Sequence, residues 1–122
     1  MTKYKTKIDE KTGITFVDIT GNIDLDGQAA FLNSESYGER TSCVVADMRN
    51  ASLGSMTRGT IVKLLRTFRP LSKPGIRVAY VFNKGEDFSK GKLMLAQQEV
   101  LGYEGKFKLF TDLEKAISWV QR

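Results

Sequence analysis

The feature of this sequence that most limits its fold is a pair of near-continuous apolar runs at residues 42–48 and 76–82. Each run has the length of a strand, and apolar residues without polar alternation are typical of a parallel strand covered on both faces. A shorter run follows at residues 107–110. Between the runs, apolar residues recur at helical spacing, at Ile61, Leu64, Leu65 and Phe68 and again at Leu93, Ala96 and Val100. Strands alternating with helices predict a mostly parallel sheet with right-handed crossovers.

The two ends of the chain complete the predicted order. Residues 4–8 alternate with lysines, which predicts a half-exposed edge strand, and the β-branched residues 14–20 predict a strand paired with it. Asp24 or Asp26 can cap a short helix, and residues 34–40 are polar and turn-rich. Near the C-terminus, Thr111 and Glu114 match a capping box for a last helix. The whole chain, residues 1–122, is therefore predicted to be one α/β domain of order β-β-α-β-α-β-α-β-α.

The composition limits the chemistry that we expect of this chain. It has no histidine and one cysteine, Cys43, so a zinc site of the common types or a His-activated nucleophile cannot be built. One cysteine also gives no internal disulfide, and a reducing cytoplasm is the default expectation. No apolar stretch approaches the ~18 residues of a membrane span, and the basic N-terminus lacks the apolar region of a secretory signal. We therefore expect no metal or cofactor, and a binding module rather than an enzyme.

The net charge of +5 is concentrated in the middle of the chain. Between residues 58 and 92, lysines and arginines far outnumber acidic residues. Lys63 and Arg66 lie about 60° apart on the predicted helix, away from its apolar face, and Arg69 flanks them. This stripe is either a solvated helix face or a docking surface for an anionic partner. No aromatic residues interleave the stripe, so we do not expect nucleic-acid binding.

Three segments carry a resemblance to a known family. They are residues 17–24 (VDITGNID), residues 44–51 (VVADMRNA) and residues 109–120 (LFTDLEKAISWV). In that order they resemble the early strand, the central strand and the closing strand and helix of STAS domains, and most closely the SpoIIAA-like branch related to SEC14 lipid carriers. The resemblance spans nearly the whole chain. It implies a mixed sheet with packed helices, and a role in protein–protein regulation, such as anti-sigma factor antagonism, or in sensing small ligands.

The same resemblance draws attention to the segment after the central strand. In phosphorylated STAS regulators this loop carries a D-S-[ST]-G motif at the start of a helix. The matching residues 52–59 (SLGSMTRG) keep hydroxyl groups at Ser55 and Thr57. They lack the aspartate, and Arg58 stands where the motif has a glycine. These two departures argue against a kinase-driven switch in this chain.

The predicted binding site is the loop over residues 52–60, because ligands of open α/β sheets lie beyond the carboxyl ends of the strands. Its residues are Ser52, Ser55, Thr57 and Arg58, with Asp47 and Arg49 from the preceding strand. Free N–H groups at the helix start would favour an anion there. The simpler interpretation is that Ser55 or Thr57 only caps the helix, and that Asp47 pairs with loop N–H groups or a basic side chain.

Three hypotheses about function follow. The leading one is a non-catalytic regulatory module that binds a protein partner or a small anionic or amphipathic ligand. The second is an enzyme that uses Asp47 with the hydroxyl of Ser55 or Thr57, which requires a deep polar pocket. The third is a homodimer whose surface includes Phe88 and Leu95, since Leu95 points about 200° away from Leu93 on the predicted helix.

Overall fold

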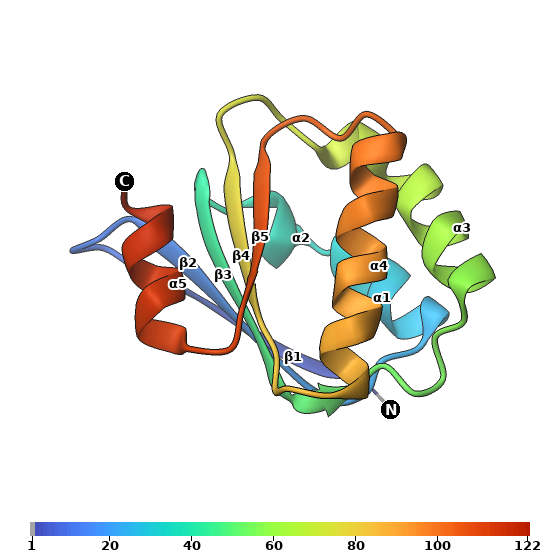
Figure 1. The fold of residues 1–122 in the computed structure, drawn as a ribbon. Helices are drawn as coiled ribbons and strands as arrows, with labels where there is room; N and C mark the ends of the chain where they lie inside the picture. Colours follow the sequence, from blue (N-terminus) through green and yellow to red (C-terminus); the bar gives the residue numbers. More distant parts are fainter. Residues whose placement is uncertain (1) are drawn as a thin grey trace.

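The centre of the molecule is a sheet of five strands in the spatial order β1-β2-β3-β4-β5 (Figure 1). The computed structural model describes residues 2–122 of the chain. The strands are β1 (Lys3–Asp9), β2 (Ile14–Asn22), β3 (Cys43–Ser52), β4 (Arg77–Val81) and β5 (Lys106–Phe110). β1 pairs antiparallel with β2, and every other neighbouring pair is parallel. The predicted mixed, mostly parallel sheet in an α/β fold is confirmed.

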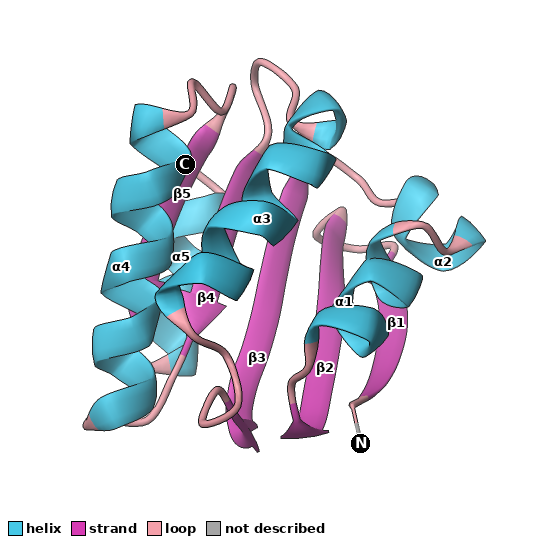
Figure 2. Ribbon diagram, turned by 90° about the vertical axis from the view of Figure 1, so that its right-hand side faces the viewer, coloured by secondary structure: helices cyan, strands magenta, loops and turns pink. Residues whose placement is uncertain are grey.

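The positions of the helices follow from this strand order. They are α1 (Leu25–Leu32), α2 (Glu35–Gly38), α3 (Arg58–Phe68), α4 (Glu86–Val100) and α5 (Leu113–Val120), with a 3₁₀ turn η1 (Arg69–Leu71). Each crossover from β2 to β5 moves one strand in the same direction, so right-handed connections place α1, α3 and α4 on one face of the sheet. Helix α5 precedes no further strand and packs on the opposite face (Figures 1 and 2). We call these the crossover face and the α5 face.

Each face of the sheet has its own apolar core. On β3, Val44, Ala46 and Met48 point into the crossover-face core, while Val45 belongs to the α5-face core with Ala116 and Val120 of α5. Val44 and Val45 are 1% and 0% exposed, so both faces of this strand are covered. This explains why β3 has no polar alternation in the sequence. Helix α5 contacts β3, β4 and β5, and the lysines of the edge strand β1 stay exposed.

The helix starts agree with the sequence in part. Asp24 caps α1, as predicted, with Oδ1 accepting a hydrogen bond of 2.6 Å from the Gly27 N–H. The capping box predicted for the last helix is wrong by one residue. Asp112, and not Thr111, is the cap, and its Oδ1 accepts from the Glu114 N–H at 2.9 Å. Residues 35–38 of the turn-rich segment form the short helix α2.

The predicted apolar face of α4 is wrong in part, because Leu93 packs against the crossover-face core whereas Ala96 and Val100 are exposed. Val100 is 77% exposed, whereas the residues of α4 that are buried are Gly91 and Gln98. A Cβ on Gly91 would lie 2.9 Å from Cε2 of Phe82, so the bulky ring at the end of β4 requires a glycine opposite it. At Gly91 a large side chain of the sheet therefore fills the interface, while Phe88, Leu93 and Met94 of α4 pack against the crossover-face core around it.

Candidate functional site

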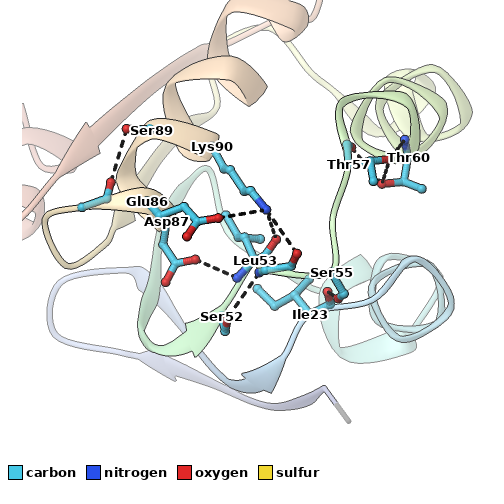
Figure 3. A network of polar contacts seen from close by, with 12 residues as sticks. Ile23, Ser52, Leu53, Ser55, Thr57, Thr60, Glu86, Asp87, Ser89 and Lys90 are labelled. Atoms are coloured by element: carbon cyan, nitrogen blue, oxygen red, sulfur yellow. Dashed lines mark hydrogen bonds and ion pairs between the residues drawn. The ribbon is translucent and has the colours of Figure 1, made fainter.

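The loop between β3 and α3 is held in place by the first turns of α4 (Figure 3). The Leu53 N–H donates to Oδ1 of Asp87 at 2.8 Å, and Nζ of Lys90 donates to the carbonyl oxygens of Leu53 at 2.9 Å and Gly54 at 3.3 Å. Glu86 lies 3.7 Å from the same ammonium group. Asp87 and Lys90 thus hold one backbone donor and two backbone acceptors of the loop. Sequence reasoning missed this role, because the partners are 34 and 37 residues apart.

The hydroxyl groups of the loop have structural partners. Thr57 caps α3 by accepting a hydrogen bond of 3.2 Å from the Thr60 N–H. Ser55 donates to the carbonyl oxygen of Ile23 at 2.8 Å, and Oγ of Ser52 accepts from the Gly54 N–H at 3.2 Å. The interpretation of Thr57 as a helix cap is confirmed. Ser55 instead ties the loop to the chain segment that follows β2 (Figure 3).

Asp47 and Arg49 do not belong to this loop. The Cα of Asp47 pairs with that of Val81, which lies in the α5-face core, and the alternation of the strand puts Asp47 on that face. Arg49 donates from Nε to Oδ1 of Asp47 at 2.9 Å and from Nη2 to Oδ2 at 2.8 Å. The structure therefore does not direct Arg49 toward the loop, and the structural interpretation of Asp47 as the partner of a basic side chain is confirmed.

This bidentate pair changes the acid–base character of both groups. The hydrogen bonds from Arg49 lower the pKa of Asp47, against the opposing effect of burial. The carboxylate in turn raises the pKa of Arg49, with smaller contributions from Asp18 and Asp112 on the same side of the sheet. A carboxylate with a lowered pKa is a weak general base. The structure does not bring Asp47 together with Ser55 or Thr57, as the enzyme hypothesis requires.

The exposed face of α3 is basic. Arg58, Lys63 and Arg66 are exposed and line one shallow groove with Gly59, Val62 and Thr67. Among residues 2–122, the ion pairs are Arg49–Asp47 and Lys90–Glu86, so the three cations of this groove have no acidic partner. Arg69 lies apart from them beyond the end of α3, with its guanidinium beside Gly102. We call Arg58, Lys63 and Arg66 the α3 basic face.

Phe88 and Leu95 do not form the exposed apolar pair that the dimer hypothesis predicts. Both are half-buried, and Phe88 packs against the crossover-face core. Nζ of Lys92 lies 5.2 Å from the centre of the Phe88 ring and covers part of it. In the described part of the chain, the large hydrophobic residues that are exposed are Tyr4, Ile8 and Val100.

No helix within residues 2–122 has the length and hydropathy needed to cross a membrane. Over the same residues, the structure gathers no group of three or more His, Cys, Asp or Glu side chains that could hold a metal ion.

Comparison with known proteins identifies the fold. No family model matches the sequence, and no curated protein matches it. Among solved structures, an anti-sigma factor antagonist from Mycobacterium paratuberculosis superposes with a TM-score of 0.61 at 14% identity, covering 100% of this chain and 96% of that one. A DUF3478 protein with a SpoIIAA-like fold from Shewanella loihica PV-4 superposes with a TM-score of 0.57 at 19% identity, covering 98% and 93%. The chain therefore has the SpoIIAA-like fold.

Proposed function

We propose that this chain, whose fold is SpoIIAA-like, is a non-catalytic regulatory module that binds an acidic surface of a protein partner. The contact surface is the α3 basic face together with the loop between β3 and α3. The observation that carries the proposal is that Arg58, Lys63 and Arg66 line one groove without a carboxylate beside them. Complementary charge across an interface selects the partner and speeds its association.

The backbone beneath the surface is fixed in place before a partner binds. The opposite side of α3 is anchored in the core by Ile61, Leu64, Leu65 and Phe68. Its first turn is fixed by the Thr57 cap, and the loop before it by Asp87 and Lys90. A backbone that is already ordered loses little conformational entropy when a partner binds, so the entropy cost falls mainly on the exposed side chains.

The fold comparison supports a regulatory role by analogy. One structural neighbour is named as an anti-sigma factor antagonist, a designation that implies action on another protein. Proteins that share a fold often differ in function, so the α3 basic face is the feature that an experiment must test.

The experiment has two stages. A photo-crosslinking residue at Thr67, in the groove, is used in the host cell to capture the partner, and the same residue at Ser118, on α5, serves as the control. The purified partner is then titrated against two double variants of equal charge change. We expect Lys63→Glu with Arg66→Glu to weaken binding at least about tenfold, because like charges across an interface cost several kcal/mol.

Lys3→Glu with Lys5→Glu on the exposed edge strand is the matched control and should leave the affinity unchanged. Equal losses in the two double variants would show only an effect of net charge. That result, or crosslinking from Ser118 as strong as from Thr67, would contradict the proposed surface.

A further inference from the structure

A cavity of about 90 Å³ lies inside the molecule, between the crossover face of the sheet and the helices that cover it. Its wall is largely apolar and includes Val44 and Ala46 of β3, Leu65 and Phe68 of α3, Met94 of α4 and Phe107 of β5. Figure 2 shows α1, α3 and α4 lying over this face. The cavity is separate from the α3 basic face, which lies on the outer side of the same helix.

One charged side chain, Arg40, lines this cavity. Its Nη1 donates to the Tyr37 carbonyl oxygen at 3.0 Å and its Nη2 to the Leu71 carbonyl oxygen at 2.6 Å. The guanidinium carbon lies 4.3 Å from the centre of the Tyr37 ring. Its Nε is buried and has no hydrogen-bond partner. A residue of the cavity wall therefore carries a positive charge and has one buried donor that no protein atom accepts from.

No anion within the cavity wall balances this charge. The lining contains no aspartate or glutamate. Burial raises the pKa of the Tyr37 and Tyr80 hydroxyls, and it raises the pKa of Tyr103 to about 12. The tyrosines of the wall thus stay neutral at physiological pH. Arg40 is half-buried, and a guanidinium that lies in a largely apolar wall without a carboxylate favours an anion supplied from outside the chain.

Two amide groups in the wall also have oxygen atoms without a hydrogen-bond partner. Gln98 is 4% exposed and donates from Nε2 to the Tyr80 hydroxyl at 3.3 Å, but its Oε1 has no partner. Oε1 of Gln28, on α1, is also buried and without a partner. Buried polar groups are nearly always hydrogen-bonded, to protein, water or ligand. These atoms indicate that the occupant of the cavity has a polar group as well as an apolar part.

We propose that this cavity binds a small amphipathic carboxylate. The carboxylate accepts a charge-assisted hydrogen bond from Nε of Arg40, and the hydrocarbon tail lies against Ala46, Leu65 and Phe107. The volume limits the size of the ligand. A water needs about 10–15 Å³ on this measure, so the cavity has room for about six to nine waters. Because a methylene group takes slightly less space than a water, about seven to ten chain atoms match this volume. Two of these atoms are the carboxylate oxygens, so a straight-chain fatty acid with about five to eight carbons is the matching class.

The test uses octanoate and octanamide as probes, which have the same tail and differ in the charge of the head group. Isothermal titration calorimetry of the full chain should show one saturable octanoate site, with an affinity at least about tenfold higher than for octanamide. Arg40→Gln should lower the octanoate affinity to the octanamide level and leave octanamide binding unchanged. Arg66→Gln, on the exposed face of α3, removes the same charge outside the cavity and should change neither.

A second variant keeps the test informative if Arg40→Gln does not fold. Ala46→Ile adds volume to the cavity wall on a strand, and should weaken octanoate binding while leaving hexanoate less affected. Amide resonances around Arg40 and Ala46 should shift when octanoate is added to the wild-type protein, whereas those of α5 should not. The absence of saturable octanoate binding, as expected if water alone fills the cavity, would overturn the proposal. Equal affinities for octanoate and octanamide, or equal effects of Arg40→Gln and Arg66→Gln, would overturn it as well.

Discussion

Replacing Asp87 by alanine removes the contact that fixes the loop between β3 and α3. Oδ1 of Asp87 accepts from the Leu53 N–H at 2.8 Å, and Leu53 itself is 7% exposed. A hydrogen bond to a charged group contributes about 1.5–3 kcal/mol, and a buried donor left without a partner costs a similar amount. Since the Asp87 residue is only partly buried, we expect a loss of about 2 kcal/mol in the free energy of unfolding.

Glu86→Ala is the matched control for this substitution. Both carboxylates stand in the first turn of α4, so each has a similar interaction with the helix dipole. Glu86 is 79% exposed and contacts Lys90 at 3.7 Å, which is an exposed pair worth about 0.3–0.5 kcal/mol. The difference between the two variants therefore isolates the hydrogen bond to the loop.

The assay is equilibrium urea unfolding, followed by circular dichroism, with thermal unfolding as a second measurement. For a domain of this size, about 2 kcal/mol corresponds to a fall of about 8 °C in Tm. Asp87→Asn keeps an oxygen at the acceptor position without the charge, and should lose about half as much as alanine. If Asp87→Ala and Glu86→Ala destabilise the protein equally, the loop is not held by this bond and the reasoning fails.

Two other predictions concern single groups whose environment is well defined. Because Arg49 lowers the pKa of Asp47 in the folded state, the pair stabilises the protein above the unfolded pKa of about 4 and this contribution disappears as the pH falls through the folded value. The stability difference between wild type and Asp47→Asn, measured by urea unfolding, should therefore shrink below about pH 4, and a constant difference would contradict the pairing. Gly91→Ala should destabilise by about 1–3 kcal/mol, since its Cβ would lie 2.9 Å from the Phe82 ring. Gly59→Ala on α3, where the nearest atom is 3.9 Å from the added Cβ, should instead be neutral or stabilising by up to about 1 kcal/mol, and equal effects in thermal unfolding would refute the argument.

Much of the fold was predictable from local patterns in the sequence. The apolar runs of β3 and β4 reflect burial on both faces, and the lysines of β1 mark an exposed edge. These signals are strong because each depends only on the faces that one strand presents. The α3 helix was equally clear, since its buried residues are all large and apolar.

The errors arose where a neighbouring element determines what a residue contacts. The fully buried residues of α4 are Gly91 and Gln98, because the side chains of Phe82 and Tyr80 fill the space beside them. The spacing of large apolar residues along a helix does not predict which positions face a bulky side chain of another element. Val100 matched the expected stripe and is instead 77% exposed.

The candidate site was predicted in part, for the same physical reason. The predicted loop over residues 52–60 lies at the carboxyl end of β3, where topology alone places it, although residues 58–60 already form the first turn of α3. Arg49 was grouped with them by sequence proximity, but strand alternation sends it to the α5 face with Asp47. Arg40 was missed altogether, because nothing in a polar, turn-rich segment indicates that its guanidinium faces an apolar cavity.

Helix α3 separates the two proposed binding sites, which makes them independent in experiments. Leu64, Leu65 and Phe68 line the cavity, whereas Lys63 and Arg66 line the outer groove. Charge reversal on the outer groove alters no atom of the cavity wall, so it should leave octanoate binding unchanged. Arg40→Gln alters no residue of the α3 basic face, so it should leave the affinity for the protein partner in the absence of ligand unchanged. If octanoate itself changes the affinity for the partner, the partner must change the affinity for octanoate by the same factor, and α3 is the element that connects the two sites.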